Sequence, residues 1–192
     1  MTFANMTWLN PPTDVTEGPD RLTVTTSANT DFWRETFYGF IRHSGHHLGQ
    51  QVTGDFTAQV TIAADYQALY DQAGLMLRLS QTHWIKAGIE LTDGQAMFST
   101  VVTNGQSDWA TLPLSFPASP MTLRLTRHGS AIRVDLREPS GIWRMARLAH
   151  LQDGPAMVGP MACSPERAGF TATFSGYTCG PAIPRILHEP HP

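Results

Sequence analysis

Short segments of alternating polarity, separated by turn residues, are the feature that most constrains how this chain can fold. Apolar and polar residues alternate in RLTVTTSA, DFTAQVTIA, MTLRLT, AIRVDLRE, GIWRMARLA and GFTATFSGY. The dipeptide Asp93-Gly94 separates IKAGIEL from AMFSTVV and favours a tight hairpin, because it tolerates the positive φ of such turns. Turn signals recur roughly every ten residues, a spacing typical of sandwiches and barrels. The sequence therefore predicts an all-β fold.

Two segments leave a helical alternative open. Good helix formers make up much of DYQALYDQA, which could hold a helical turn or two before Gly74. A single turn is also compatible with SPERAG at 164–169.

The length of 192 residues suits a single all-β domain with a sizeable core. We expect one domain over residues 1–180. The Pro-rich tail at 181–192 is expected to pack loosely.

Charge and hydropathy exclude several classes of function. A formal net charge of -3 argues against a nucleic-acid partner, which would need clustered positive charge. No apolar run approaches the roughly 20 residues that cross a bilayer, so no membrane partner is expected. The sequence MTFANMTWLNPP lacks the pattern of a secretory signal, which predicts a cytoplasmic protein with Cys163 and Cys179 as reduced thiols.

The stretch YDQAGLMLRLSQTHWIKAGIE predicts two antiparallel strands with very different faces. One face is apolar and should point to the core, with Leu75, Leu77, Leu79, Ile85, Ala87 and Ile89. The other face mixes rings, an amide and both signs of charge: Tyr70, Gln72, Arg78, Trp84, Lys86 and Glu90. Rings stack on the apolar face of a sugar and polar groups bond its hydroxyls, so this row predicts a binding site for a carbohydrate or polyol. The alternative is a charged outer face with one half-exposed Trp.

The geometry of that row is a specific prediction. Lys86 is the only lysine among 13 Lys and Arg residues. Strand alternation places it on the same side as Trp84 and Glu90. We expect these three side chains to share a hollow that a guest can enter, with Trp84 as an exposed stacking surface.

Two further stretches contribute candidates. In NGQSDW, Asp108 and Trp109 are expected on or beside a loop, either as site residues or as part of a turn with Trp109 closing the core edge. The stretch DFWRETFYGFIRHSGHHL is rich in aromatic residues and contains His43, His46 and His47. No HExxH motif or Cys pair accompanies these histidines, so no metal site is predicted. Trp33 or His46 is expected at the rim of the pocket.

The sequence favours catalysis less than it favours binding. Asp71, Glu90 and Asp108 are the carboxylates considered for glycoside hydrolysis, which needs an acid and a second carboxylate. Asp71 should point away from Gln72, and no strand carries a paired-acid motif. Glu90 remains the one candidate acid or base, its pKa raised by burial and lowered by Lys86. Nucleotide-binding motifs are missing, so no cofactor is expected.

Four blocks resemble a known family: DFWRETFYGF, YDQAGLMLRLSQTHWIKAGIE, VVTNGQSDW and VGPMACSPERAGFTATFSGY. They are similar to the "regulation of enolase protein" family, within the concanavalin A-like lectin/glucanase superfamily. The resemblance implies a jelly-roll sandwich of two curved antiparallel sheets, with a concave face that holds carbohydrate in relatives. Carried over by position, the family-like residues are Trp33, Tyr38, His46, Tyr70, Gln72, Trp84, Lys86, Glu90, Asp108 and Trp109. The paired acids of glucanases are missing here, which argues against hydrolysis.

Together these observations predict a cytoplasmic lectin-like module that binds a carbohydrate or polyol-like small molecule. One alternative is an enzyme acting on sugars or related metabolites through Glu90. The other is a regulatory scaffold of carbohydrate metabolism with another protein as partner.

Overall fold

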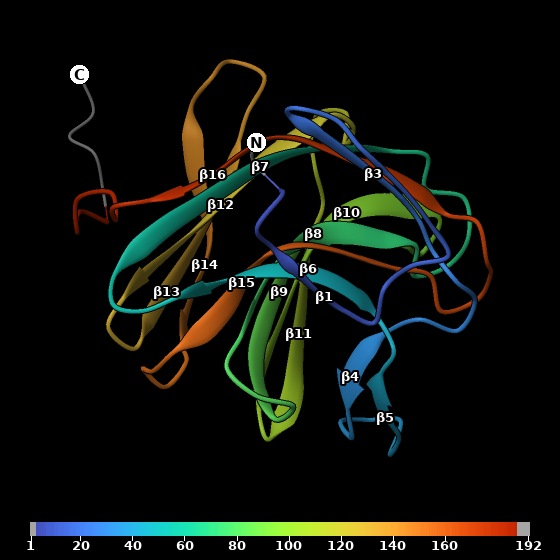
Figure 1. The fold of residues 1–192 in the computed structure, drawn as a ribbon, viewed down its shortest axis with the longest axis horizontal. Coiled ribbons are helices and arrows are strands. Elements are labelled where there is room, and N and C mark those ends of the chain that lie inside the picture. The colour runs from blue at the N-terminus through green and yellow to red at the C-terminus, as the bar shows by residue number, and fades with distance from the viewer. Residues whose placement is uncertain (1–2, 188–192) are drawn as a thin grey trace.

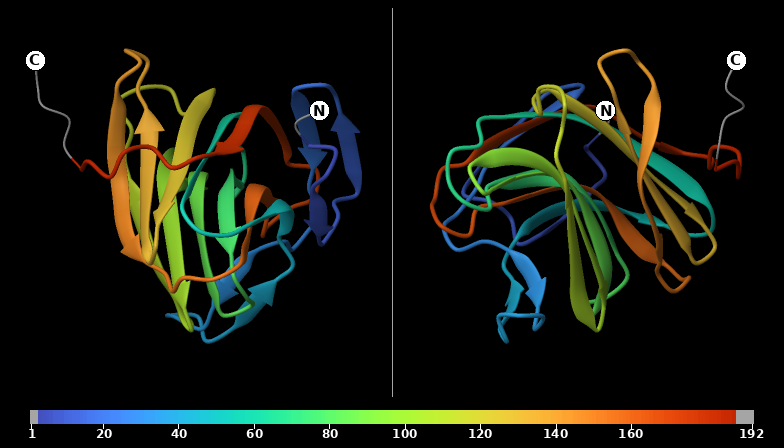
Figure 2. Two further views of the ribbon diagram at one scale, coloured as in Figure 1. Left: turned by 60° about the vertical axis from the view of Figure 1, so that its left-hand side comes forward. Right: turned by 180° about the vertical axis from the view of Figure 1, so that it is seen from behind.

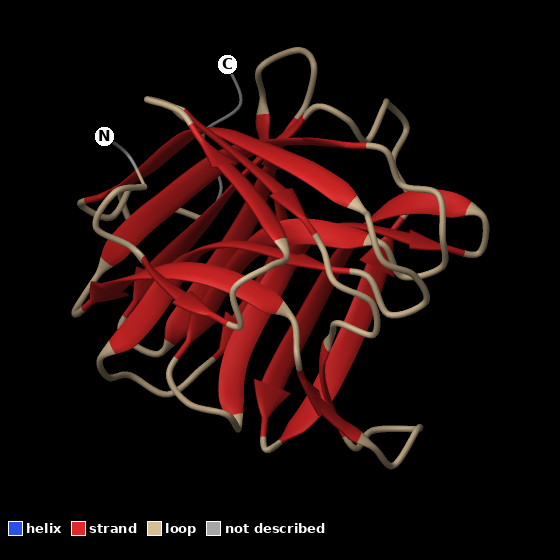
Figure 3. Ribbon diagram, turned by 45° about the vertical axis from the view of Figure 1, so that its right-hand side comes forward, coloured by secondary structure: helices blue, strands red, loops and turns tan. Residues whose placement is uncertain are grey.

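The computed structural model describes residues 3–187, and these form a β-sandwich (Figure 1). No α-helix occurs within this range (Figure 3). Nor does any described segment supply a helix of the length and apolarity that a bilayer requires. The prediction of an all-β sandwich with two antiparallel sheets is confirmed.

Two seven-stranded antiparallel sheets pack face to face (Figure 2). The first, here called the front sheet, has the order β1 (Thr7–Leu9), β6 (His46–Val52), β15 (Ala156–Cys163), β8 (Gln72–Arg78), β9 (His83–Thr92), β10 (Gln95–Asn104) and β11 (Gln106–Leu112). The second, the back sheet, has the order β14 (Trp143–His150), β13 (Ala131–Arg137), β12 (Met121–His128), β7 (Phe56–Ala64), β16 (Thr171–Gly180), β3 (Arg21–Thr25) and β2 (Asp14–Glu17).

A separate hairpin of β4 (Phe32–Arg34) and β5 (Ile41–His43) completes the fold. It lies beside the front sheet (Figure 1), and Phe32 and Trp33 of β4 pack in one cluster with Met76 and Trp84 of that sheet. The hairpin therefore covers the face of the front sheet that points away from the back sheet, here called the outer face.

The core lies between the sheets, where the apolar sides of the predicted strands meet. Leu75, Leu77, Ile85, Ala87 and Ile89 are buried there, as alternation predicts. Opposite them the back sheet contributes Val60, Ile62, Leu123 and Leu125, among others. Burying a side chain of this size contributes about 2 kcal/mol, so the core is the main favourable term for the fold.

The tight turns follow local sequence. Asp93 and Gly94 join β9 to β10 with φ values of 52° and 73°, the paired positive values of the turn that matches strand twist. The predicted strands at 121–126 and 131–138 also pair across Gly129, which has a φ of 59°.

The helical alternatives are wrong. Residues before β8 form a loop around Asp71, whose carboxylate accepts the backbone N–H groups of Gln67 and Ala68 at 3.0 Å each. Ser164 and Arg167 donate to the same carboxylate, at 2.7 and 2.6 Å, so the 164–169 segment is anchored as a loop as well. The Asp71 pKa is lowered: burial opposes this, but the bond from Arg167 and the other three donors outweigh it.

The ends of the chain and its thiols complete the description. The division into a domain at 1–180 and a tail stays a prediction, and the part of the tail at 188–192 lies outside the described residues. Within 181–187, the Ile183 N–H bonds the Thr57 hydroxyl at 3.0 Å, while Ile186 is exposed. Cys163 and Cys179 are free thiols.

Candidate functional site

The outer face of the front sheet is divided by the β4–β5 hairpin. One part lies beneath the hairpin, where Phe32 and Trp33 of β4 form a second apolar cluster with Met76, Trp84, Val101, Met161 and Cys163 of the sheet. We call this the covered half. The other part, the open half, carries Gln72, Lys86, Glu90 and Trp109 and borders a cavity of about 240 Å³. Strand β9 runs through both halves.

Trp84 belongs to the covered half. Its side chain is 0% exposed and packs on Phe32, with ring centroids 6.1 Å apart. Its indole N–H donates to the Gln81 carbonyl at 3.3 Å. The expectation that Trp84 offers an open stacking surface is therefore wrong, because the hairpin supplies a hydrophobic cover that strand alternation cannot reveal.

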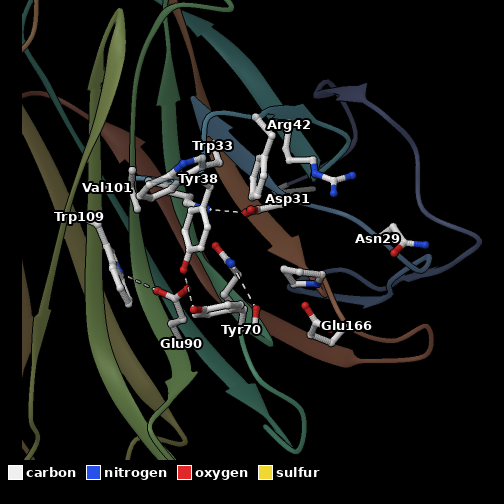
Figure 4. A pocket seen from close by; sticks show the side chains of 14 residues that line it. Asn29, Asp31, Trp33, Tyr38, Arg42, Tyr70, Glu90, Val101, Trp109 and Glu166 are labelled. Carbon is white, nitrogen blue, oxygen red and sulfur yellow. Dashed lines mark hydrogen bonds and ion pairs between the residues drawn. The ribbon is translucent and has the colours of Figure 1, made fainter. Parts of the chain in front are cut away.

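Lys86 and Glu90 do line the cavity, as alternation from Trp84 predicts. Figure 4 shows Glu90 between Trp109 and Tyr70. The Lys86 ammonium lies 2.9 Å from the Asp31 carboxylate. Burial opposes the charge on Lys86, but the carboxylate of Asp31 outweighs it and the pKa of Lys86 is raised. The residue is thus held as a paired cation.

Glu90 is almost completely buried, and burial raises the pKa of its carboxyl group against the opposing charge of Lys86. The indole N–H of Trp109 is shared between Glu90 Oε2, at 3.1 Å, and the Ser99 hydroxyl, at 3.0 Å. This bond fixes the Trp109 ring beside the carboxylate. Trp109 itself is 37% exposed, so a guest can reach its ring.

Two tyrosines stand opposite each other at the cavity. Tyr38, at the hairpin tip, and Tyr70, in the loop before β8, join hydroxyl to hydroxyl at 3.0 Å (Figure 4). This bond, followed by burial, raises the pKa of Tyr70 to about 12. Gln72 lies next to Glu90 across the β8–β9 register and donates to the Tyr70 carbonyl at 3.2 Å. The hairpin and the sheet are therefore linked across the cavity.

Two glycines lie within the strands that carry the polar row. Gly74 and Gly88 face each other on β8 and β9, and Gly88 sits between Lys86 and Glu90. A Cβ at either position would collide with a backbone carbonyl of the neighbouring strand. These glycines let the two strands approach closely.

The structure brings together seven of the eleven residues singled out from the sequence. The cavity is lined by Trp33, Tyr38, Tyr70, Gln72, Lys86, Glu90 and Trp109. Trp84 lies under the hairpin, and the other three lie elsewhere. Asp108 points away from the cavity to an ion pair with Arg147 at 2.9 Å, and both Asp108 and Trp109 lie within β11 rather than in a loop.

His46 and Arg78 are also outside the cavity. His46 is buried, with Nδ1 2.6 Å from the Asn10 carbonyl and Nε2 accepting the Ser27 N–H at 3.1 Å. Of the two residues expected at the rim, Trp33 lines the cavity and His46 does not, because both of its ring nitrogens hold backbone segments together. Arg78 lies at the far end of β8, across from Trp84.

The side chains of His43, His46 and His47 do not form a common metal-binding group. Burial first, and the charge of Arg78 second, lower the pKa of His47 to about 3. Among the described residues no group of three His, Cys, Asp or Glu side chains has the arrangement of a metal site.

Sequence reasoning missed several residues of the cavity: Asn29, Asp31, Phe40, Arg42, Val101, Pro165 and Glu166. One signal was available for Asp31, since a buried lysine needs a carboxylate partner. Pro165 and Glu166 reach the cavity because their neighbours Ser164 and Arg167 are bound to Asp71. That long-range anchor has no local sequence pattern.

Comparison with known proteins supports the fold and the family. The chain is 45% identical over 184 residues to "Regulation of enolase protein 1" of Saccharomyces cerevisiae, a match covering 95% of this chain and 93% of the relative. The crystal structure of a functionally unknown protein from S. cerevisiae superimposes with a TM-score of 0.92 at 44% identity, covering 96% of this chain and 100% of that one.

A more distant likeness concerns the fold alone. Xylan β-1,4-xylosidase from Bacillus halodurans C-125 is 9% identical with a TM-score of 0.66, over 83% of this chain and 32% of the enzyme. The concanavalin A-like jelly roll and the enolase-regulation resemblance are thereby confirmed. A family model described as "Protein of unknown function (DUF1349)" matches residues 8–182, and the chain belongs to that family.

Proposed function

We propose that the chain binds a carbohydrate or a similar polyol, with one ring in the cavity of the open half. The observation that carries this proposal is the convergence of five aromatic rings and a row of buried polar groups on one cavity. The rings are Trp33, Tyr38, Phe40, Tyr70 and Trp109, and the polar row is Gln72, Lys86 and Glu90. Rings can stack on the apolar face of a sugar, and the polar row can bond its hydroxyl groups.

The polar groups have hydrogen-bonding capacity left for a guest. A carboxylate offers about four acceptor positions, more than Trp109 and Ser99 fill at Glu90. The ammonium of Lys86 has three protons, and Asp31 takes one. Because these groups are buried, a ligand that completes their bonds gains more than it would at an exposed site.

The size and charge of the cavity restrict which ligands it can hold. A cavity of about 240 Å³ is small for a ligand pocket and suits one sugar ring. Its walls carry the carboxyl groups of Asp31, Glu90 and Glu166 against the cations Lys86 and Arg42. An anionic ligand such as a sugar phosphate would add to this negative charge, so we propose an uncharged sugar.

The test is titration calorimetry with a panel of neutral monosaccharides. We expect at least one to bind, and Glu90→Gln to weaken that sugar roughly tenfold, the order expected for losing a hydrogen bond to a charged group. Gln51→Leu, on the same sheet but outside the cavity, is the matched control and should bind as the wild type does. If none of the monosaccharides in the panel binds, the proposal is rejected.

An enzyme acting on sugars is the second candidate. It is favoured by the raised pKa of Glu90, which suits a general acid, and by the presence of Asp31 and Glu166 in the same cavity. Release of nitrophenol from p-nitrophenyl glycosides, lost in Glu90→Gln, would establish it. Absence of release with every glycoside would leave binding as the function.

A regulatory role in the cytoplasm is the third candidate, and it rests on the 45% identical relative named for the regulation of enolase. Purified enolase would be assayed with and without the chain, in the presence and absence of the bound sugar. An unchanged rate and no co-purification would reject this role. Microscopy of a tagged chain would test the cytoplasmic location.

A further inference from the structure

A second hollow lies next to the cavity. It is a groove of about 570 Å³ lined by Trp33, Thr36, Phe37, Tyr38, Ser107, Asp108 and Trp109. Trp33, Tyr38 and Trp109 line the cavity as well, so the two spaces share a wall of aromatic rings. A molecule bound in one is within reach of the other.

Phe37 marks this groove as more than an incidental surface feature. Its side chain is 95% exposed, and its φ is 63°, a backbone conformation that bulky residues seldom adopt. An exposed apolar ring and a strained backbone both cost stability, and such costs persist most often at functional sites. The ring of Phe37 contacts Tyr38 edge to face at 5.1 Å, which continues the aromatic wall outward from the cavity.

The hairpin tip holds Phe37 in a defined place. The Arg34 N–H bonds the Ser107 hydroxyl at 2.9 Å, and the Arg34 Nε bonds the Gly105 carbonyl at 2.8 Å. Within the tip, the Gly39 N–H bonds the Glu35 carbonyl at 2.6 Å. The groove is thus bounded by the hairpin on one side and by β11 on the other.

We infer that the groove is a second sugar subsite, so the ligand is a glycan of at least two rings. This inference rests on the proposed function. One ring occupies the polar cavity, and the next stacks in the groove between Phe37 and Trp109. The groove walls supply aromatic surface and the exposed Thr36 hydroxyl, while the charge of Asp108 is paired with Arg147. The second ring is therefore uncharged too.

The test compares matched sugars by titration calorimetry: glucose with cellobiose, xylose with xylobiose, and galactose with lactose. For the pair that binds, we expect the disaccharide to bind roughly 2- to 10-fold more tightly, the range for one aromatic contact. Phe37→Asn should abolish this advantage and leave the monosaccharide affinity unchanged. Phe37→Trp, which keeps an aromatic ring, should retain the tighter binding of the disaccharide.

A stability measurement separates this effect from misfolding. Asn tolerates a positive φ, so urea unfolding of Phe37→Asn should show a free energy of unfolding equal to or above that of the wild type. Ile142→Asn, at another exposed apolar position, is the matched control and should leave every sugar affinity unchanged.

Four results would overturn the inference. Equal affinity for monosaccharide and disaccharide, or a Phe37→Asn variant that keeps the disaccharide advantage, removes the second subsite and leaves the single-ring cavity in place. Equal weakening of both sugars by Phe37→Asn does the same, because the residue would then act on the cavity. Failure of every sugar to bind the wild type rejects the proposed function together with the subsite.

Discussion

The covered half and the open half of the outer face differ in environment although they share strand β9. Trp84 and Lys86 are two residues apart and point to the same side of the sheet. Trp84 is sealed beneath Phe32, whereas Lys86 lines a cavity and bonds Asp31. The same alternation rule placed both side chains on this face. What separates a core residue from a site residue is the hairpin, which comes from residues 32–43.

The comparison also shows how an outer face becomes buried. In β9 every residue from Trp84 to Glu90 is buried, so this strand has no solvated side. On the covered half the burial comes from apolar packing. On the open half it comes from polar side chains that bond one another, and such groups keep capacity for a ligand.

Replacing Trp84 and Trp109 tests the difference between the two halves and should give the largest effect on stability. Trp84→Ala removes a fully buried ring, and we expect the free energy of unfolding to fall by about 3–5 kcal/mol. Trp109→Ala removes a ring that is 37% exposed, so about 1 kcal/mol is expected, together with loss of sugar binding. Urea unfolding of both variants checks this, and equal losses would mean that the halves do not differ.

The ion pair at the boundary between the halves gives the next effect. Asp31→Asn keeps the bond to the Phe32 N–H but removes the counter-ion of Lys86, leaving a buried cation unpaired. We expect a loss of about 3 kcal/mol and a lower pKa of Lys86. Asp108→Asn breaks the exposed pair with Arg147 and should cost at most about 1 kcal/mol. Equal losses of unfolding free energy in Asp31→Asn and Asp108→Asn would contradict the assignment of the Asp31 pair as buried.

The smallest expected effect is on the pH dependence of stability, through Glu90 in the open half. Burial raises the pKa of Glu90 in the folded state, so its favourable contribution to stability is present below the unfolded pKa of about 4.3 and is lost as pH rises through the folded pKa. Glu90→Gln should therefore lose this part of the pH dependence and be more stable than the wild type at neutral pH. Parallel pH profiles of unfolding for the two proteins would contradict the raised pKa.

Much of the fold was readable from local sequence. The hairpin at Asp93-Gly94 and the apolar row from Leu75 to Ile89 follow from turn chemistry and from the two-residue period of a strand. The helix propensity of DYQALYDQA was misleading, because the Asp71 carboxylate recruits donors from two distant loops and holds the segment open. Propensity is a weak prior, and a buried charged group outweighs it.

The site was readable only in part. Alternation selected Gln72, Lys86 and Glu90 because all of them sit on regular strands. It carries no information on His46, whose ring links Asn10 and Ser27, or on Asp31, which reaches Lys86 from 55 residues away. Contacts between segments so distant leave no period in the sequence.

The sequence by itself determined which face of each strand is apolar, where the tight turns lie and which strand carries the lysine and the carboxyl group at 86 and 90. Only the tertiary structure decided that the indole at 84 is core, that the indole at 109 is exposed, and that a hairpin tip with Phe37 borders a groove beside the cavity. The physical reason is that side-chain direction is a local property of the backbone, whereas exposure depends on what else packs against that side.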